Sequence, residues 1–135
     1  MMKFKASMAA ITLSCGLMVT LMITGVAAAH HSVAAVELDK TAIATGTVKV
    51  FEWTNPHAWI WVEVPDGKGG SQDMGFECAS LTMLRRGGWT RDMLKPGDKV
   101  TVSYHPLRDG KTGGMFVDAE FADGSTISSM LKANQ

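Results

Sequence analysis

The stretch GTVKVFEWTNPHAWIWVEV, residues 46–64, decides the fold. Apolar residues alternate with other residues on both sides of Thr54-Asn55-Pro56. Period-two alternation is typical of strands, whose successive side chains point to opposite faces, and Asn-Pro is a turn signal. The stretch therefore predicts a β-hairpin with one apolar face made of Val48, Val50, Ala58, Ile60, Val62 and Val64.

The chain after this hairpin predicts three more strands and one short helix. Met74 to Cys78 forms a third strand, and Ser80 caps a helix that Gly87-Gly88 terminates. After the turn Lys95-Pro96-Gly97-Asp98, alternation over Val100–Tyr104 and again over Met115–Phe121 adds two strands, and Asp123-Gly124 leads into a polar tail. Three strands, a helix and two strands predict a mostly β protein: a small five-stranded barrel of the oligonucleotide/oligosaccharide-binding (OB) type.

The N-terminus has the features of a secretory signal peptide. Lys3 and Lys5 precede an uncharged apolar run, and Ala27-Ala28-Ala29 offers the small residues that signal peptidase requires. We therefore expect a signal peptide at 1–29, cleavage after Ala29, and a single OB-like domain at 30–135 in the periplasm or outside the cell. After cleavage we expect no stable membrane insertion.

Two other fates of this segment compete with cleavage. The apolar run approaches the length of about 20 residues that spans a bilayer, so an uncleaved anchor is one alternative. Lipidation at Cys15 is the other, although Thr12-Leu13-Ser14 is a poor match to a lipobox.

Charge and cysteine content narrow the function of the mature chain. It keeps eleven basic and thirteen acidic residues, a net charge of −2, because only Lys3 and Lys5 leave with the signal. This balance argues against a nucleic-acid partner, which calls for a basic patch. Cys78 is the one cysteine left, so no internal disulfide forms, and we expect a buried, inert thiol.

Cleavage before His30 would create a chelating group. The free α-amine and the imidazole of His30 together bind a metal, and a second imidazole completes a T-shaped set of nitrogens that suits Cu(II). His57, after the Asn-Pro turn, and His105, before Pro106, are the candidates for that imidazole. His31 is a weaker candidate, because adjacent side chains diverge in extended chain. The competing interpretation is that these histidines are structural or lie on the surface.

A second candidate site is aromatic. On the hairpin, alternation places Phe51, Trp53, Trp59 and Trp61 opposite the apolar positions, on one shared face. Such faces bind glycans, quaternary amines or protein partners. The alternative is that these rings belong to the core, as large aromatics commonly do.

Catalytic motifs are missing from the sequence. It has no phosphate-binding Gly-Lys loop, no Cys-x-x-Cys and no serine-hydrolase context. We therefore expect a binding protein, with copper as its candidate ligand, and not an enzyme. Besides copper binding and binding through the aromatic face, a copper-dependent oxidative enzyme is a third hypothesis.

Several segments together carry a family resemblance. These are Ala29-His30-His31-Ser32, Trp53-Thr54-Asn55-Pro56-His57-Ala58, Arg86-Gly87-Gly88-Trp89, Leu94-Lys95-Pro96-Gly97-Asp98 and Arg108-Asp109-Gly110. The set resembles the small secreted bacterial proteins of the domain of unknown function 6152 family, in which His-His-Ser is usually followed by an aromatic residue; Val33 stands in that place here. The resemblance implies a periplasmic location and a single domain, and it implies no activity.

Overall fold

The computed structural model describes residues 33–129. By its internal contacts the chain divides into two units, Met1–Ala34 and Ala35–Gln135, and the fold described below is that of the second unit. The predicted signal peptide, Cys15, His30 and His31 lie outside the described residues. Within residues 33–129, no helix is long and apolar enough to cross a membrane.

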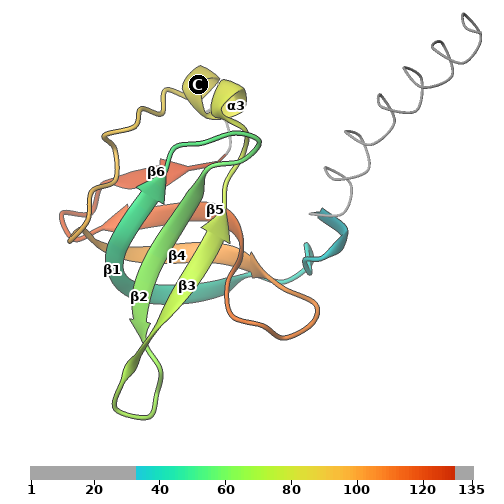
Figure 1. Cartoon of the computed structure of the whole chain (residues 1–135), viewed down its shortest axis with the longest axis vertical. Coiled ribbons are helices and arrows are strands. Elements are labelled where there is room, and N and C mark those ends of the chain that lie inside the picture. The colour runs from blue at the N-terminus through green and yellow to red at the C-terminus, as the bar shows by residue number, and fades with distance from the viewer. Residues whose placement is uncertain (1–32, 130–135) are drawn as a thin grey trace, which may run out of the picture. The chain divides into compact units, whose positions relative to one another are not determined.

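Five strands close into a barrel, and a sixth lies at its edge (Figure 1). The strands follow the order β3-β2-β1-β4-β5-β6, and a parallel pairing of β3 with β5 closes the ring. With the one short helix between β3 and β4, this confirms the predicted mostly β, OB-like barrel. The elements are β1 (Ala42–Glu52), β2 (Trp59–Pro65), β3 (Ser71–Glu77), α3 (Leu81–Arg86), β4 (Lys99–Pro106), β5 (Gly114–Phe121) and β6 (Thr126–Ser128).

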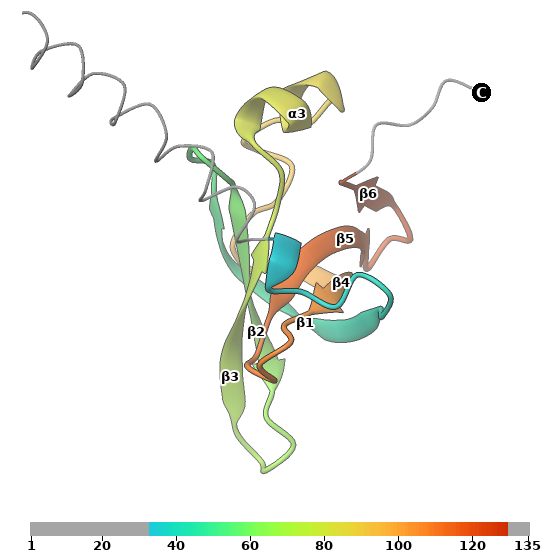
Figure 2. The ribbon, with the colours of Figure 1, turned by 90° about the vertical axis from the view of Figure 1, so that its right-hand side faces the viewer.

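The short helix begins and ends where the sequence predicts. The Ser80 hydroxyl caps α3 by accepting a hydrogen bond from the Met83 N–H at 3.4 Å. Gly87 closes the last turn, and Gly88 has a φ of 83°, a conformation that favours glycine. Helix α3 lies at the opposite end of the barrel from the turn that joins β2 to β3 (Figures 1 and 2).

Apolar side chains from every barrel strand fill the interior. The least exposed are Phe76, Ile60, Leu84, Val48, Val62 and Val102. Cys78 is buried beside them, as expected, and burial raises the pKa of its thiol, which keeps it protonated. The predicted alternation is thus confirmed along β2 and in the first half of β4.

A bulge corrects the predicted face of β1. The pairing between β1 and β2 shifts between Val48 and Val50, so one extra residue enters β1. Val48 is buried, whereas Val50 is 41% exposed. After the shift Phe51 lies opposite Ile60 and packs against the core, so the prediction that Val50 faces inward was wrong.

The alternation predicted for β5 holds at Ala119, which belongs to the core, and at Phe121, which packs against it, but it fails earlier in the strand, for a similar reason. Register between β4 and β5 shifts between Ser103 and Tyr104. Phe116 and Ala119 therefore face the interior, while Met115 and Val117 do not belong to the core.

The end of the domain was predicted as a polar tail, and part of it is a strand. After a turn at Asp123-Gly124, β6 pairs with β5. The indole Nε1 of the buried Trp89 donates a hydrogen bond of 3.0 Å to the Ser128 carbonyl oxygen. This bond ties β6 to the chain that follows α3.

The segment ahead of β1 runs beside the end of β4. Val36 is buried and forms a bridge with Leu107. The N–H of Arg108 donates to the Ala35 carbonyl at 2.9 Å, and the N–H of Glu37 donates to the Pro106 carbonyl at 2.9 Å. These bonds fix the start of the domain close to His105.

Candidate metal centre

His57 is held beside β3 by backbone hydrogen bonds of its neighbour. Ala58 donates to the Ala79 carbonyl at 3.3 Å and accepts from the Cys78 N–H at 2.8 Å, which extends the pairing of β2 with β3 by one residue. This pairing brings the His57 Nδ1 to 2.5 Å from the Glu77 Oε1. The two side chains are only 29% and 19% exposed, so the contact is partly shielded from water.

His105 is held by a different partner. It lies on β4, and its Nδ1 is 2.7 Å from the carbonyl oxygen of Lys40, the residue two positions before β1. The bonds of the segment ahead of β1 keep that carbonyl in place.

The partners of both rings determine which nitrogen can bind a metal. A carbonyl oxygen and an ionised carboxylate accept hydrogen bonds and cannot donate them, so Nδ1 carries the proton in both rings. In a neutral imidazole the lone pair is then on Nε2. Neither Nε2 has a hydrogen-bond partner within residues 33–129. Metal-binding histidines commonly show this arrangement, in which a carboxylate or a carbonyl orients the ring from behind.

The described residues do not make a complete metal site by themselves. Among residues 33–129, no group of three or more histidine, cysteine, aspartate and glutamate side chains is placed to hold a metal ion. Glu77 and His105 belong to one row of outward positions across β3, β5 and β4, and His57 contacts Glu77 from the chain just before β2. Glu77, which holds His57, pairs with Met115 on β5, and Met115 pairs with His105 on β4. Adjacent strands are about 4.8 Å apart, so Glu77 and His105 are separated by about 10 Å.

The four aromatic residues of the second candidate site do not share one face. Phe51 and Trp53 pack against the core and meet edge to face, with ring centroids 5.4 Å apart. Trp59 and Trp61 lie on the outer face of β2 and stack with an interplanar angle of 18°. The bulge in β1 separates the two pairs, so the expectation of one four-ring face was wrong. The outer pair remains a candidate binding surface.

Trp61 has an unusual environment on this outer face. Its ring lies over Gly75, where a Cβ atom would come within 2.7 Å of the ring. The Trp61 Nε1 is buried and has no hydrogen-bond partner among the described residues.

Two groups that position the histidines were missed by the sequence reasoning. Glu77 is the outward residue after the buried Phe76, and nothing local marks it as a partner of His57. Lys40 holds His105 through its backbone carbonyl oxygen, and since every residue has such a carbonyl, the residue type gives no signal.

A surface hollow lies away from both histidines. It has a volume of about 340 Å³. Its lining comes from the middle of β1, the last residues of β2, Gly70 and Ser71 at the start of β3, and Lys99 on β4. None of the predicted site residues lines it.

Comparison with known protein families identifies the family of this chain. Residues 18–117 match the family described as "Family of unknown function (DUF6152)". The chain belongs to this family. The match includes His30, His31, His57 and His105, so the candidate ligands of this DUF6152 member all lie within the family region. No curated protein and no solved structure matches the chain.

Proposed function

We propose that this DUF6152 protein is an exported copper-binding protein. In the proposal, cleavage after Ala29 frees the amine of His30, and this amine and the His30 imidazole bind Cu(II). The imidazole of His57 supplies the third nitrogen, with His105 as the alternative. His31 is not required, although the backbone amide between His30 and His31 is a further possible nitrogen ligand.

The observation that carries the proposal is the orientation of the two imidazoles. Each ring is fixed through Nδ1 and keeps Nε2 available for a metal. We favour His57 because a carboxylate behind a ring makes it a more basic ligand than a carbonyl does.

In the proposal, His30 approaches the imidazoles from the start of the domain. Ala35, five residues after His30, is hydrogen-bonded to Arg108, which is three residues after His105.

The role we propose is binding of copper outside the cytoplasm, not turnover. The predicted signal peptide supports this location, and the net charge of −2 predicted for the mature chain argues against a nucleic-acid partner. An oxidative copper enzyme remains the competing interpretation. It predicts peroxide formation from oxygen when a reductant is added to the copper-loaded protein, and our proposal predicts none above free copper.

Calorimetry with histidine variants tests the ligand set. The mature chain starting at His30 is titrated with Cu(II), and the His57→Gln and His105→Gln variants are titrated in parallel. Loss of one nitrogen ligand should weaken binding by at least about tenfold, which is 1.4 kcal/mol. We expect this loss in His57→Gln and a smaller one in His105→Gln. Unchanged affinity in both variants would overturn the proposal.

The stacked pair Trp59 and Trp61 supports a second candidate function. The pair is only partly buried on the outer face, and Trp59 lies between Glu52 on β1 and Glu77 on β3. Aromatic rings flanked by carboxylates attract cationic ligands such as quaternary amines. In this reading the pair binds a small molecule, a glycan or a protein partner, and the histidines are structural. A change in tryptophan fluorescence on adding such ligands, lost in Trp59→Ala, would favour this function.

A further inference from the structure

Trp59 and Trp61 form a flat aromatic platform on the outer face of β2. Their ring centroids are 5.9 Å apart and their planes differ by 18°, so the pair offers one nearly planar surface. Trp61 lies opposite Val50 on β1 and Gly75 on β3. Val50 is 41% exposed, and Gly75 has no side chain that could cover the rings. An exposed apolar patch with a polar rim is typical of a binding surface.

The side chains around this platform carry a net negative charge. They are four carboxylates and one ammonium, from Glu52, Glu63, Asp73, Glu77 and Lys49. Four negative charges and one positive charge give −3. The Lys49 ammonium is already paired with Asp73 at 2.8 Å, so it does not serve the rings as their cation. The platform is therefore complementary to a cation from outside, since the face of an indole ring attracts positive charge.

Another tryptophan of the same chain has its cation supplied internally. The guanidinium carbon of Arg85 lies 5.8 Å from the centroid of the Trp53 ring. Within residues 33–129, no cationic side chain lies over Trp59 or Trp61 in this way. The chain thus satisfies one tryptophan by itself and leaves the platform open to another molecule.

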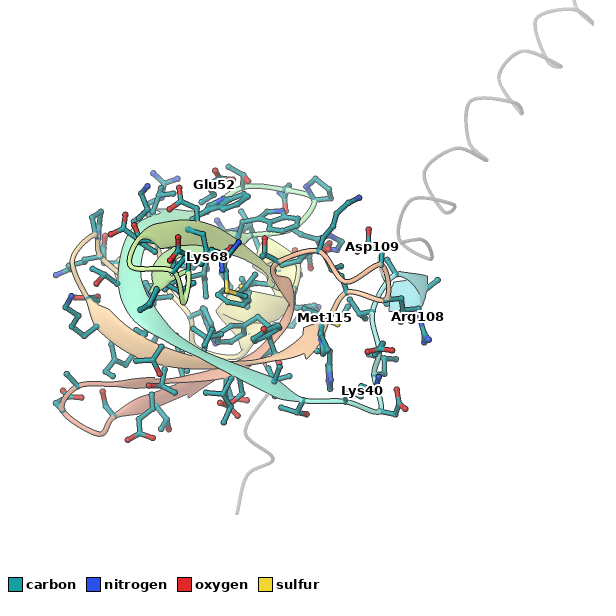
Figure 3. The ribbon with its side chains drawn as sticks, turned by 90° about the horizontal axis from the view of Figure 1, so that it is seen from below. Lys40, Glu52, Lys68, Arg108, Asp109 and Met115 are labelled. Atoms are coloured by element: carbon teal, nitrogen blue, oxygen red, sulfur yellow. The ribbon has the colours of Figure 1, made fainter. Side chains whose placement is uncertain are left out.

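The flatness of the platform selects the shape of the cation. Quaternary amines are tetrahedral and are recognised by cages of rings that surround them, whereas these two rings lie nearly parallel. A guanidinium is planar, stacks on aromatic faces and donates two parallel hydrogen bonds to a carboxylate. The exposed Glu52 offers that carboxylate directly opposite Trp59. Figure 3 shows Glu52 on the outer side of the barrel, away from the cationic side chains of Lys40 and Arg108.

We propose that the aromatic platform binds an arginine side chain of a partner protein. The guanidinium stacks on Trp59 and donates to the Glu52 carboxylate, and Val50 contacts apolar groups next to that arginine in the partner. The inference rests on the second candidate function and deepens it, because it names the ligand of the Trp59 and Trp61 pair. It does not depend on copper.

The test is a titration of the mature chain, labelled with ¹⁵N at the indole nitrogens, with the peptide acetyl-Gly-Arg-Gly-amide in the presence of EDTA. We expect the Trp59 indole signal to shift and to saturate. The signal of Trp89, which is 4% exposed and bonded to the Ser128 carbonyl, serves as an internal control and should stay in place. The same peptide with lysine in place of arginine should bind at least about threefold more weakly, which is the scale of an exposed ion pair.

Two matched substitutions complete the test. Glu52→Gln keeps the size of an exposed side chain, so we expect it to fold normally and to weaken binding of the arginine peptide by at least about threefold. Glu120→Gln, equally exposed on β5, should leave binding unchanged. An unmoved Trp59 signal, equal affinity for the two peptides, or unchanged affinity in Glu52→Gln would overturn the inference. A Trp59 signal that moves with protein concentration alone would also overturn it, because a second copy would then cover the platform.

Two other ligands separate this inference from the function on which it rests. Tetramethylammonium and maltose are titrated in the same way. If either of them shifts the Trp59 signal and the arginine peptide does not, the pair is a binding surface and the inference alone fails. If no ligand shifts the signal, the inference and the second candidate function fail together. Because EDTA removes free copper, none of these outcomes bears on the copper site, which the His57→Gln variant tests.

Discussion

The Glu77 carboxylate lies 2.5 Å from the His57 Nδ1 and so determines which nitrogen of that ring faces outward. Glu77 ends β3 and His57 precedes β2, and the antiparallel pairing of these strands brings the two together. The contact is partly shielded, and it leaves the Nε2 lone pair available. A surface histidine without such a partner has no fixed tautomer and no fixed ring orientation.

Replacing Glu77 with glutamine tests this relationship. Glu77→Gln keeps the size of the side chain and removes the charge that makes His57 a stronger ligand. Loss of such an orienting partner typically costs 10- to 100-fold in metal affinity, and we expect about tenfold weaker Cu(II) binding by calorimetry. Glu52→Gln is the matched control, since Glu52 lies on the same outer face, across β2, and is exposed. Equal affinities of the two variants would contradict the role of Glu77.

Sequence patterns predicted most of the barrel because its strands are amphipathic. Residues such as Ile60, Val62 and Val102 alternate with outward residues, and glycines and prolines mark the turns between strands. The two bulges could not be predicted in this way. One bulge lies in β1 between Val48 and Val50, and the other lies in β5 opposite Ser103 and Tyr104. Whether a strand accepts an extra residue depends on how it pairs with its neighbour, and beyond each bulge the inward and outward positions are exchanged.

The candidate site was predicted only in part, for the same reason. His57 and His105 stand out by residue type, whereas Glu77 joins His57 only through the antiparallel pairing of β2 with β3. That pairing links residues twenty positions apart, and no local pattern encodes it. The aromatic face was mispredicted because the β1 bulge turns Phe51 toward the core.

Gly75 supplies a second prediction, about stability. A Cβ atom at this position would lie 2.7 Å and 2.8 Å from ring carbons of Trp61, which is itself stacked on Trp59. Forcing extra atoms into such a contact typically costs about 1–3 kcal/mol. We expect Gly75→Ala to lower the free energy of unfolding in urea by that amount, with a shift of tryptophan emission. Ser71→Ala, at the exposed start of the same strand, should change it by less than about 0.5 kcal/mol. Equal stability of both variants would show that Trp61 moves freely.

Trp89 is expected to hold the barrel edge. Its ring is 4% exposed, meets Phe116 edge to face, and donates from Nε1 to the Ser128 carbonyl oxygen. Trp89→Phe removes this hydrogen bond and leaves space in the core, so we expect a loss of about 1–3 kcal/mol in the free energy of unfolding. Amide exchange in β6 should accelerate more than in β2. Trp59→Phe on the outer face is the control, and a larger loss there would contradict this assignment.

Cys78 should be chemically silent in the folded protein. Burial raises the pKa of its thiol because the charged thiolate loses hydration, and the Glu77 charge adds to the effect. The thiolate is the reactive form, so the folded protein should not react with a thiol reagent at pH 8, and urea should release one reactive thiol per mature chain. Rapid reaction of the native protein would mean that this end of β3 opens readily.

The measurement that tests the central claim most directly is electron paramagnetic resonance of the Cu(II)-loaded mature chain. The sample that begins at His30 is compared with one that carries a single extra residue ahead of His30, each with one equivalent of copper. The account predicts a one-to-one tetragonal Cu(II) signal with nitrogen hyperfine structure in the first sample and its loss in the second. Identical spectra from the two samples would contradict the claim, because a site that ignores the His30 amine is not the one proposed here.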